Sequence, residues 1–319
     1  MSVLVGIDEA GFGPILGPLV VSSSALSLPR QLLKSDLWQV LSKSVAIRRR
    51  GLAGRLLVAD SKKVYSRAVG IGDLERTVLA FLRCLGHEPA TLGELLMLLC
   101  PSCMPRLADY PWHEGADGYR LSACITDGRI ASSVLADDLS ANGMSVLELK
   151  SCCFDVAYYN KLIGDVKNKA SVLFTATAEL IQRAFDSFGD DDLQVIVDRQ
   201  GGRVRYREVL RRMFPELELT ILSESAALSS YQLCRNGKRM RLHFVVAADE
   251  RFLPVSLASM VCKYLRELLM GGMNRYFARF SGDLRPTAGY WTDGLRFIKD
   301  IKTKLPHVPV DDNQFIRSR

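Results

Sequence analysis

The chain has 319 residues, a formal net charge of +7 and a pI of about 9.0, and 48% of its residues are hydrophobic. This hydrophobic content supports a sizeable core and argues against global disorder, and no apolar run reaches the roughly 18 residues of a membrane span. Eight scattered cysteines and a start without a signal-peptide pattern predict reduced thiols in a cytoplasmic protein without membrane contact.

The chain opens on an apolar strand that ends in two adjacent acids. The predicted strand Val3–Ile7 runs into Asp8 and Glu9, and a turn rich in glycine and proline follows over residues 10–14. Ionised carboxylates beside a core must be paired or hold a cation, and glycine lets the backbone approach a ligand closely. The pattern predicts a metal site beside a backbone loop; the alternative is a hairpin turn with solvated acids.

Strands and helices alternate up to residue 86. A strand over 19–26 is expected to pair with the first strand as a hairpin, and a helix is predicted over 31–44. A short strand over 56–59 ends at the run Asp60-Ser-Lys-Lys63, and an amphipathic helix follows over 72–85.

The segment 87–144 has a different texture, with several prolines and glycine turns. We predict that it is an insertion or small subdomain, with a helix over 91–99 and a hairpin over 119–134. The sequence assigns it no role.

The segment also holds the one cysteine pair at metal-ligand spacing, Cys100-Pro-Ser-Cys103, with His113 and Cys124 further along. A zinc clip is one interpretation. Buried inert thiols are the favoured one, because a second close pair of ligands is missing.

Regular α/β texture resumes after residue 144, and a mixed sheet with helices on its faces is the natural assembly. Strands are predicted over 145–150, 194–198 and 218–222, a hairpin over 231–235 and 240–246 around Asn236-Gly237, and helices over 169–188, 203–213, 254–270 and 275–280.

Three of the predicted apolar segments end in carboxylates. Asp8 and Glu9 follow the first, Asp198 ends the second and Asp249 follows the third. If the strands are neighbours in one sheet, the acids converge at one edge, where α/β sheets place their ligands. Four carboxylates without histidine suit Mg²⁺ or Mn²⁺ rather than zinc. Two such ions would serve an in-line phosphoryl displacement.

Basic residues are gathered in several runs. They are Arg48–Arg50 with Arg55, Lys62 and Lys63; Arg203, Arg205, Arg207, Arg211 and Arg212; and Arg235, Lys238, Arg239 and Arg241. Together with the acids, these runs predict a track for a phosphate backbone around a metal site.

Five segments, in this order, carry a resemblance to a known family. They are Gly6-Ile-Asp-Glu-Ala-Gly-Phe-Gly-Pro14, Asp60-Ser-Lys-Lys63, Val195-Ile-Val-Asp198, Ala248-Asp249 with Pro254–Lys263, and Gly289-Tyr290. They resemble the motifs of the type 2 ribonucleases H, the family of ribonuclease HII, and they spread across most of the chain. The first and fourth are the most specific.

The resemblance implies an α/β fold of the ribonuclease H type, a mixed five-stranded sheet with flanking helices. Residues 1–86 and 145–319 would form the catalytic domain, with 87–144 inserted as a subdomain of unknown role. The implied activity is metal-dependent endonucleolytic hydrolysis of the RNA strand of RNA/DNA hybrids, or of ribonucleotides embedded in duplex DNA, giving 5′-phosphate and 3′-hydroxyl ends. No protein partner is implied.

The resemblance also assigns roles to individual residues. Asp8, Glu9, Asp198 and Asp249 would be catalytic ligands of Mg²⁺ or Mn²⁺, with two ions. The substrate would be contacted by the loop Gly11, Phe12 and Gly13, by Lys62 and Lys63, and by Tyr290, which would stack against the sugar beside the ribonucleotide.

Two positions depart from the family pattern. Phe12 stands where the family usually has a basic residue, and Ala248 stands where a basic residue often precedes the fourth acid. We expect Phe12 to pack into the core. These losses keep open two alternatives on the same fold: a non-catalytic nucleic-acid-binding or assembly protein, and a nuclease for another DNA structure.

Overall fold

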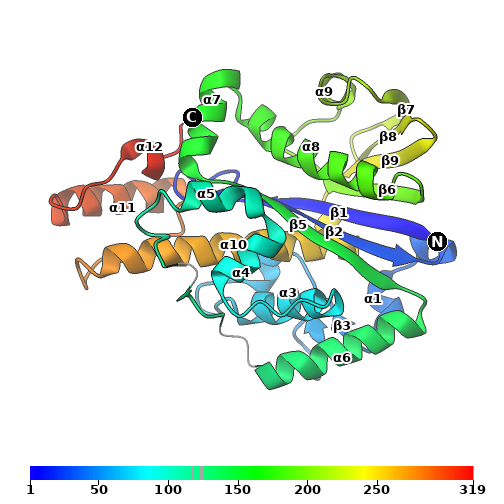
Figure 1. Cartoon of the computed structure of the whole chain (residues 1–319), viewed down its shortest axis with the longest axis horizontal. Coiled ribbons are helices and arrows are strands. Elements are labelled where there is room, and N and C mark those ends of the chain that lie inside the picture. The colour runs from blue at the N-terminus through cyan, green and yellow to red at the C-terminus, as the bar shows by residue number, and fades with distance from the viewer. Residues whose placement is uncertain (116–117, 122–124, 319) are drawn as a thin grey trace.

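The computed structural model describes residues 1–115, 118–121 and 125–318 (Figure 1). Within these ranges the main sheet has seven strands in the order β5-β2-β1-β6-β9-β8-β7, and β3 pairs with β4 in a small second sheet. The strands are β1 (Ser2–Ala10), β2 (Leu19–Leu28), β3 (Val45–Ala46), β4 (Leu56–Leu57), β5 (Ser145–Phe154), β6 (Asp192–Asp198), β7 (Glu218–Glu224), β8 (Leu228–Arg235) and β9 (Lys238–Val245).

The sheet is mixed, as predicted, but larger. β1 pairs antiparallel with β2 and parallel with β6, and β6 pairs parallel with β9. The predicted five-stranded sheet corresponds to the five neighbouring strands β5-β2-β1-β6-β9. Strands β8 and β7 extend it by antiparallel pairing. The predicted Asn236-Gly237 hairpin joins β8 to β9, and both turn residues have the positive φ that such a turn requires.

Helices cover both faces of the sheet. The α-helices, with 3-10 helices marked η, are η1 (Arg30–Lys34), α1 (Leu37–Val40), α2 (Ser61–Val64), α3 (Gly72–Cys84), α4 (Leu92–Leu99), η2 (Pro101–Cys103), α5 (Met104–Leu107), α6 (Ile125–Ala141), α7 (Val156–Val166), α8 (Lys169–Phe188), α9 (Arg207–Met213), η4 (Ala248–Glu250), α10 (Leu253–Ala278), α11 (Trp291–Lys304) and α12 (Asp312–Phe315). Figure 1 shows α8 on one side of the sheet and α10 on the other. No described helix is long and apolar enough to cross a membrane.

The alternation of side chains along β1 builds the two cores. Val3, Val5 and Ile7 pack with residues of α8, whereas Leu4 packs in the core that contains α10 and α3. This follows from the period of two in a strand. The first strand is therefore buried on both faces, so the acids that follow it begin in the interior.

The segment 87–144 shares the core of the sheet. The predicted helix over 91–99 is confirmed as α4, and Leu95 and Leu135 lie in the same hydrophobic cluster as Leu4. The predicted hairpin over 119–134 is wrong from residue 125 on, where α6 forms. Buried Ala131, Leu135 and Leu139, four residues apart, make a helical stripe.

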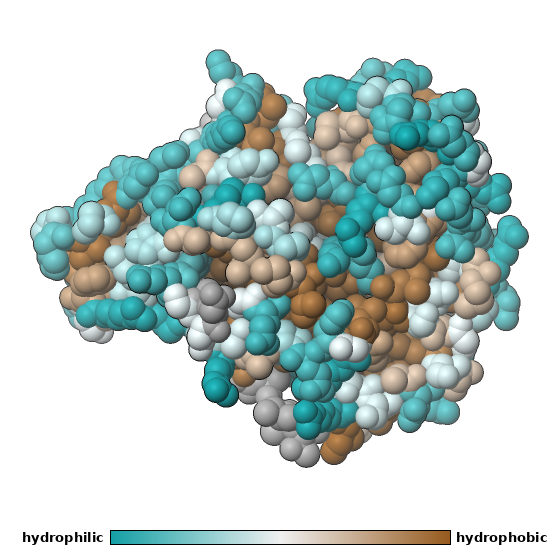
Figure 2. Space-filling view, viewed as in Figure 1, coloured by the Kyte–Doolittle hydropathy of each residue, from teal (hydrophilic) through white to brown (hydrophobic). Residues whose placement is uncertain are grey.

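Apolar side chains also remain exposed on α4 and α6. Met97 is 57% exposed and Ile130 is 62% exposed. Figure 2, which shows the molecule from the same side as Figure 1, shows hydrophobic patches on the face turned to the viewer.

The predicted helix over 31–44 is also wrong. Only η1 and the four-residue α1 form there. The side chain of Asp36 accepts a hydrogen bond from the N–H of Trp38 at 2.9 Å, which caps a new short helix and ends any continuous one. The N–H of Ser44 donates to Asp138 Oδ2 at 3.0 Å, which ties the chain to α6.

Gly6 allows α10 to lie directly against β1. A Cβ at this position would lie 2.6 Å from the carbonyl oxygen of Pro254 and would overlap the backbone of Pro254 and Val255. Because backbone cannot move aside as a side chain can, we expect Gly6→Ala to lower the free energy of unfolding by roughly 3 kcal/mol. Urea denaturation checks this, and a midpoint equal to that of the wild type would contradict it.

His243 on β9 makes folding stability depend on pH. Its Nδ1 lies 2.8 Å from Ser230 Oγ and its Nε2 lies 3.1 Å from Gln194 Oε1. Burial lowers the pKa of His243 to about 4. Since the unfolded chain takes up this proton near pH 6.5, stability is full above that pH and is lost as the pH falls toward 4. Urea unfolding between pH 7.5 and 4.5 should show a shallower loss for His243→Gln than for the wild type; equal slopes would exclude a contribution from His243.

Candidate active site

Parallel strands that lie side by side bring the predicted acids to one edge of the sheet. Asp8 and Glu9 lie near the end of β1, Asp198 ends β6 and Asp249 lies in η4, which follows β9. The ladder between β1 and β6 ends one residue before Asp8 and Asp198. The expected convergence follows from this strand order.

The four carboxylates affect one another. Burial raises the pKa of Asp8 well above its usual range, and the charges of Glu9 and Asp198 raise it further. Burial and Asp198 raise the pKa of Glu9 to about 8, and the same two causes raise the pKa of Asp249 to about 6. Burial also raises the pKa of Asp198, which the N–H of Ala248 opposes by donating to Asp198 Oδ1 at 2.7 Å. The site therefore favours a positive partner.

A cavity of about 330 Å³ opens beside these acids. Its wall is formed by Asp8, Glu9, Ala10, Gly11, Phe12, Gly13, Pro14, Ser61, Lys62, Tyr65, Asp198, Lys263, Arg266 and Tyr290. Eight of the ten predicted site residues thus line one cavity. Asp249 and Lys63 do not.

Sequence comparison with curated proteins finds ribonucleases HII. The chain is 38% identical over 79 residues to ribonuclease HII of Gluconobacter oxydans (strain 621H), which is 24% of this chain and 38% of that protein. It is 30% identical over 146 residues to ribonuclease HII of Latilactobacillus sakei subsp. sakei (strain 23K), which is 44% of this chain and 54% of that protein. Over these stretches the chain is similar to ribonucleases HII. The matches span about half or less of those relatives' length, and no family model matches the chain.

Solved structures of such ribonucleases also align with this chain. The alignment with ribonuclease HII in its PCNA complex from Archaeoglobus fulgidus covers 99% of this chain and 94% of that chain, with 17% identity and a TM-score of 0.47. Ribonuclease H2 from Pyrococcus horikoshii OT3 covers 96% and 90%, with 13% identity and a TM-score of 0.47.

The two predicted lysines lie in different environments, Lys62 at the cavity and Lys63 on the surface. Asp60 caps α2 by accepting a hydrogen bond from the N–H of Lys62 at 2.9 Å, and Lys62 lines the cavity. Burial opposes the charge of Lys62, but Asp60 and Asp249 outweigh it and raise the pKa of Lys62. Lys63 instead pairs with Glu250 at 2.7 Å on the surface. Of these two lysines, Lys62 is the one that could contact a ligand in the cavity.

The loop and the tyrosine lie on the same cavity wall. Phe12 packs against the core on the α8 side of the sheet, as predicted, and its ring also forms part of the wall. Tyr290, immediately before α11, is 52% exposed. Its ring is therefore accessible to a ligand in the cavity.

Of the residues on or behind the wall that were not predicted as site residues, four form a polar group. Tyr65 donates to Glu267 Oε2 at 2.7 Å, and Lys263 donates to Glu267 Oε1 at 2.7 Å. Lys263 also lies 4.4 Å from the centre of the Tyr65 ring, and Arg266 is the fourth residue. The sequence had a signal, since residues 263, 266 and 267 share one helical face. Only packing shows that this face meets the cavity.

The predicted donor atoms are of the kind that a hard divalent cation prefers. They belong to four carboxylates, and the buried Oε2 of Glu9 has no hydrogen-bond partner among the described residues. A cation would supply that partner. Within the described ranges, however, no three His, Cys, Asp or Glu side chains are gathered closely enough to form a metal-binding group in this structure.

The zinc alternative at the cysteine pair is not supported in the described part of the chain. Cys103 Sγ lies 3.4 Å from Cys100 Sγ, and both thiols are buried and free, but no metal-binding group forms around them. His113 lies in a separate cavity. Cys124 lies outside the described residues. Buried thiols, the favoured interpretation, fit these positions.

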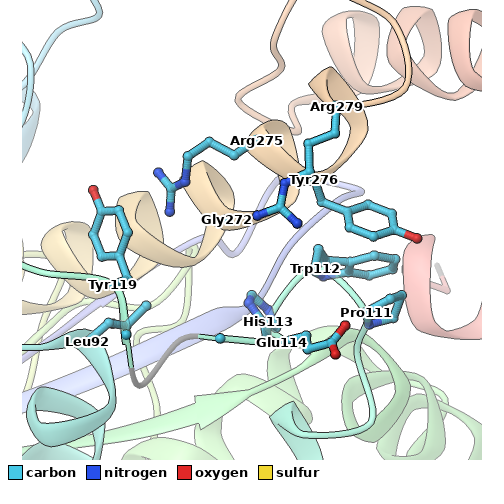
Figure 3. A pocket seen from close by; sticks show the side chains of 12 residues that line it. Leu92, Pro111, Trp112, His113, Glu114, Tyr119, Gly272, Arg275, Tyr276 and Arg279 are labelled. Carbon is cyan, nitrogen blue, oxygen red and sulfur yellow. The ribbon is translucent and has the colours of Figure 1, made fainter.

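A second cavity, of about 180 Å³, lies between α10 and residues 111–115, 118 and 119. Figure 3 shows Arg275 and Arg279 projecting from α10, with Trp112 facing Tyr276. The guanidinium of Arg275 lies 4.2 Å from the centre of the Tyr119 ring. None of the predicted site residues lines this cavity, so it is not part of the candidate active site.

Proposed function

We propose that this protein is a metal-dependent endonuclease that hydrolyses the RNA strand of RNA/DNA hybrids or ribonucleotides embedded in duplex DNA. The products would carry 5′-phosphate and 3′-hydroxyl ends. The observation that carries the proposal is the convergence of Asp8, Glu9, Asp198 and Asp249 at the ends of three adjacent parallel strands, beside a cavity that also holds Lys62. The sequence similarity to ribonucleases HII supports it.

In this proposal the four carboxylates hold Mg²⁺ or Mn²⁺, with two ions. Such ions supply Lewis-acid stabilisation of the charge that develops on the phosphate oxygens. Lys62 adds a point charge toward the phosphate, and Tyr290 offers its exposed ring to a sugar. The loop Gly11–Gly13 approaches the substrate with its backbone. Residues 1–86 and 145–319 form the catalytic domain, with 87–144 inserted.

Phe12 favours a second candidate, a nucleic-acid-binding protein without catalysis. The loop lacks a basic side chain, and Phe12 packs against the core on the α8 side of the sheet. Such a protein would bind duplexes with strong salt dependence but would not turn them over.

A cleavage assay separates the two. It uses Mg²⁺ or Mn²⁺ and three labelled duplexes: DNA with one ribonucleotide, a full RNA/DNA hybrid, and all-DNA. Metal-dependent cleavage of either ribose-containing duplex supports the endonuclease. Tight binding of all three without cleavage would reject it in favour of the binding protein, and cleavage of the all-DNA duplex would reject selectivity for ribose.

A further inference from the structure

Arg266 on α10 is a buried cation whose hydrogen-bonding capacity is only partly used. Its side chain is 1% exposed, yet it forms part of the wall of the acidic cavity. Its Nη2 donates to the carbonyl oxygens of Ala288 at 2.9 Å and Leu16 at 3.3 Å. Its Nε and Nη1 have no hydrogen-bond partner among the described residues, although Nη1 forms an ion pair with Glu267 Oε1 at 3.7 Å. Buried charged donors left without acceptors are costly and indicate a missing partner.

The position of Arg266 shows what that partner is. A Cβ on Gly11 would lie 2.7 Å from Arg266 Nε, so the guanidinium lies against the glycine loop. The same guanidinium lies 5.9 Å from the centre of the Tyr290 ring. Its unpartnered donors are themselves buried and lie behind the glycine loop, at the wall of the cavity through which the proposed substrate strand would pass. Guanidinium groups bind phosphate oxygens through paired N–H donors.

We propose that Arg266 binds a phosphate of the substrate strand and supplies the positive charge that Phe12 removes from the glycine loop. This inference rests on the proposed function. A charged hydrogen bond of this kind contributes roughly 10- to 100-fold in affinity.

Arg317 provides a matched control. It is also buried, at 4% exposure, and its Nε donates to the carbonyl oxygen of Gly17 at 2.7 Å while its Nη1 donates to that of Gly11. Its guanidinium lies 4.8 Å from the centre of the Tyr159 ring, and it does not line the cavity. Arg317 therefore supports the same loop from the core; its Nη2 is also buried without a described partner, but Arg317 does not line the cavity.

The test measures binding and needs no cleavage. In an Asp8→Asn background, affinities are measured for duplex DNA with one ribonucleotide and for a series in which single phosphates near it are replaced by neutral methylphosphonates. One replacement should weaken binding roughly 10- to 100-fold. That loss should shrink to less than about threefold in Arg266→Gln but persist in full in Arg317→Gln. Phe12→Arg added to Arg266→Gln should restore part of the affinity. Arg266→Lys, which keeps the charge, should retain part of the loss and serves if Arg266→Gln does not fold.

A scan in which no methylphosphonate weakens binding, or in which the loss is the same with and without Arg266, would overturn the inference. Cleavage by the protein with Asp8 intact is scored separately. Coupling of Arg266 to one phosphate in a protein that never cleaves would support the phosphate site and reject the nuclease. Cleavage without coupling would reject only the role of Arg266.

Discussion

Asp8→Asn is expected to abolish metal-dependent cleavage of both ribose-containing duplexes. Asp8 is one of the four clustered acids, and burial together with the charges of Glu9 and Asp198 raises its pKa. An amide at this position is a poor ligand for a divalent cation. Losing the ions removes several kcal/mol of charge stabilisation, or roughly a thousandfold in rate. Single-turnover cleavage in Mg²⁺ measures this, and residual cleavage within tenfold of the wild type would contradict it.

The same substitution should leave the fold and the binding of duplexes intact. The raised pKa of Asp8 means that its ionised form is disfavoured in the folded protein without metal. Under metal-free conditions the Asp8→Asn variant should therefore have a free energy of unfolding equal to or higher than that of the wild type. Asp192→Asn is the control, because Asp192 begins β6 at the end opposite to Asp198 and accepts a hydrogen bond from Ser2 at 3.0 Å. Cleavage should survive in that variant.

The sheet and the acids could be predicted because the sequence encodes them locally. The apolar runs before Asp8, Asp198 and Asp249 are short, continuous and followed at once by polar residues. The parallel order of β1, β6 and β9 then makes their ends adjacent. The local pattern places each carboxylate at the end of a strand, and the strand order in the sheet brings the carboxylates to one edge.

The cationic wall of the cavity could not be predicted in the same way. Lys263, Arg266 and Glu267 lie in one long helix whose side chains are mostly buried all round, so periodicity does not tell which stripe faces a site. Arg266 became a candidate only when the structure placed it against Gly11. Arg317 supports the loop from 306 residues away in sequence, a contact that no local pattern contains. The failed helix over 31–44 has a partly local origin, since Asp36 caps a new short helix, and only the bond of Ser44 to Asp138 of α6 is long-range.

Two glycines of one loop should respond differently to the same substitution. Gly11 has φ of +90°, and a Cβ there would lie 2.6 Å from the carbonyl oxygen of Pro18 and 2.7 Å from Arg266 Nε. Left-handed backbone costs an alanine roughly 1–2 kcal/mol, and the overlap with Pro18 adds to this because backbone oxygen cannot rotate away. We expect Gly11→Ala to lower the free energy of unfolding by roughly 3 kcal/mol.

Gly11→Ala should also displace the loop from the cavity, and displacements near 1 Å cost roughly a hundredfold in rate. Gly13→Ala is the matched control, since a Cβ at Gly13 has no neighbour within 4 Å and its φ is not in the left-handed region. Urea unfolding and cleavage of the single-ribonucleotide duplex measure both variants. Because Gly13→Ala changes the loop without strain, it should remain near the wild type in urea unfolding, and equal losses of stability in the two variants would show that the loop does not depend on the conformation of Gly11.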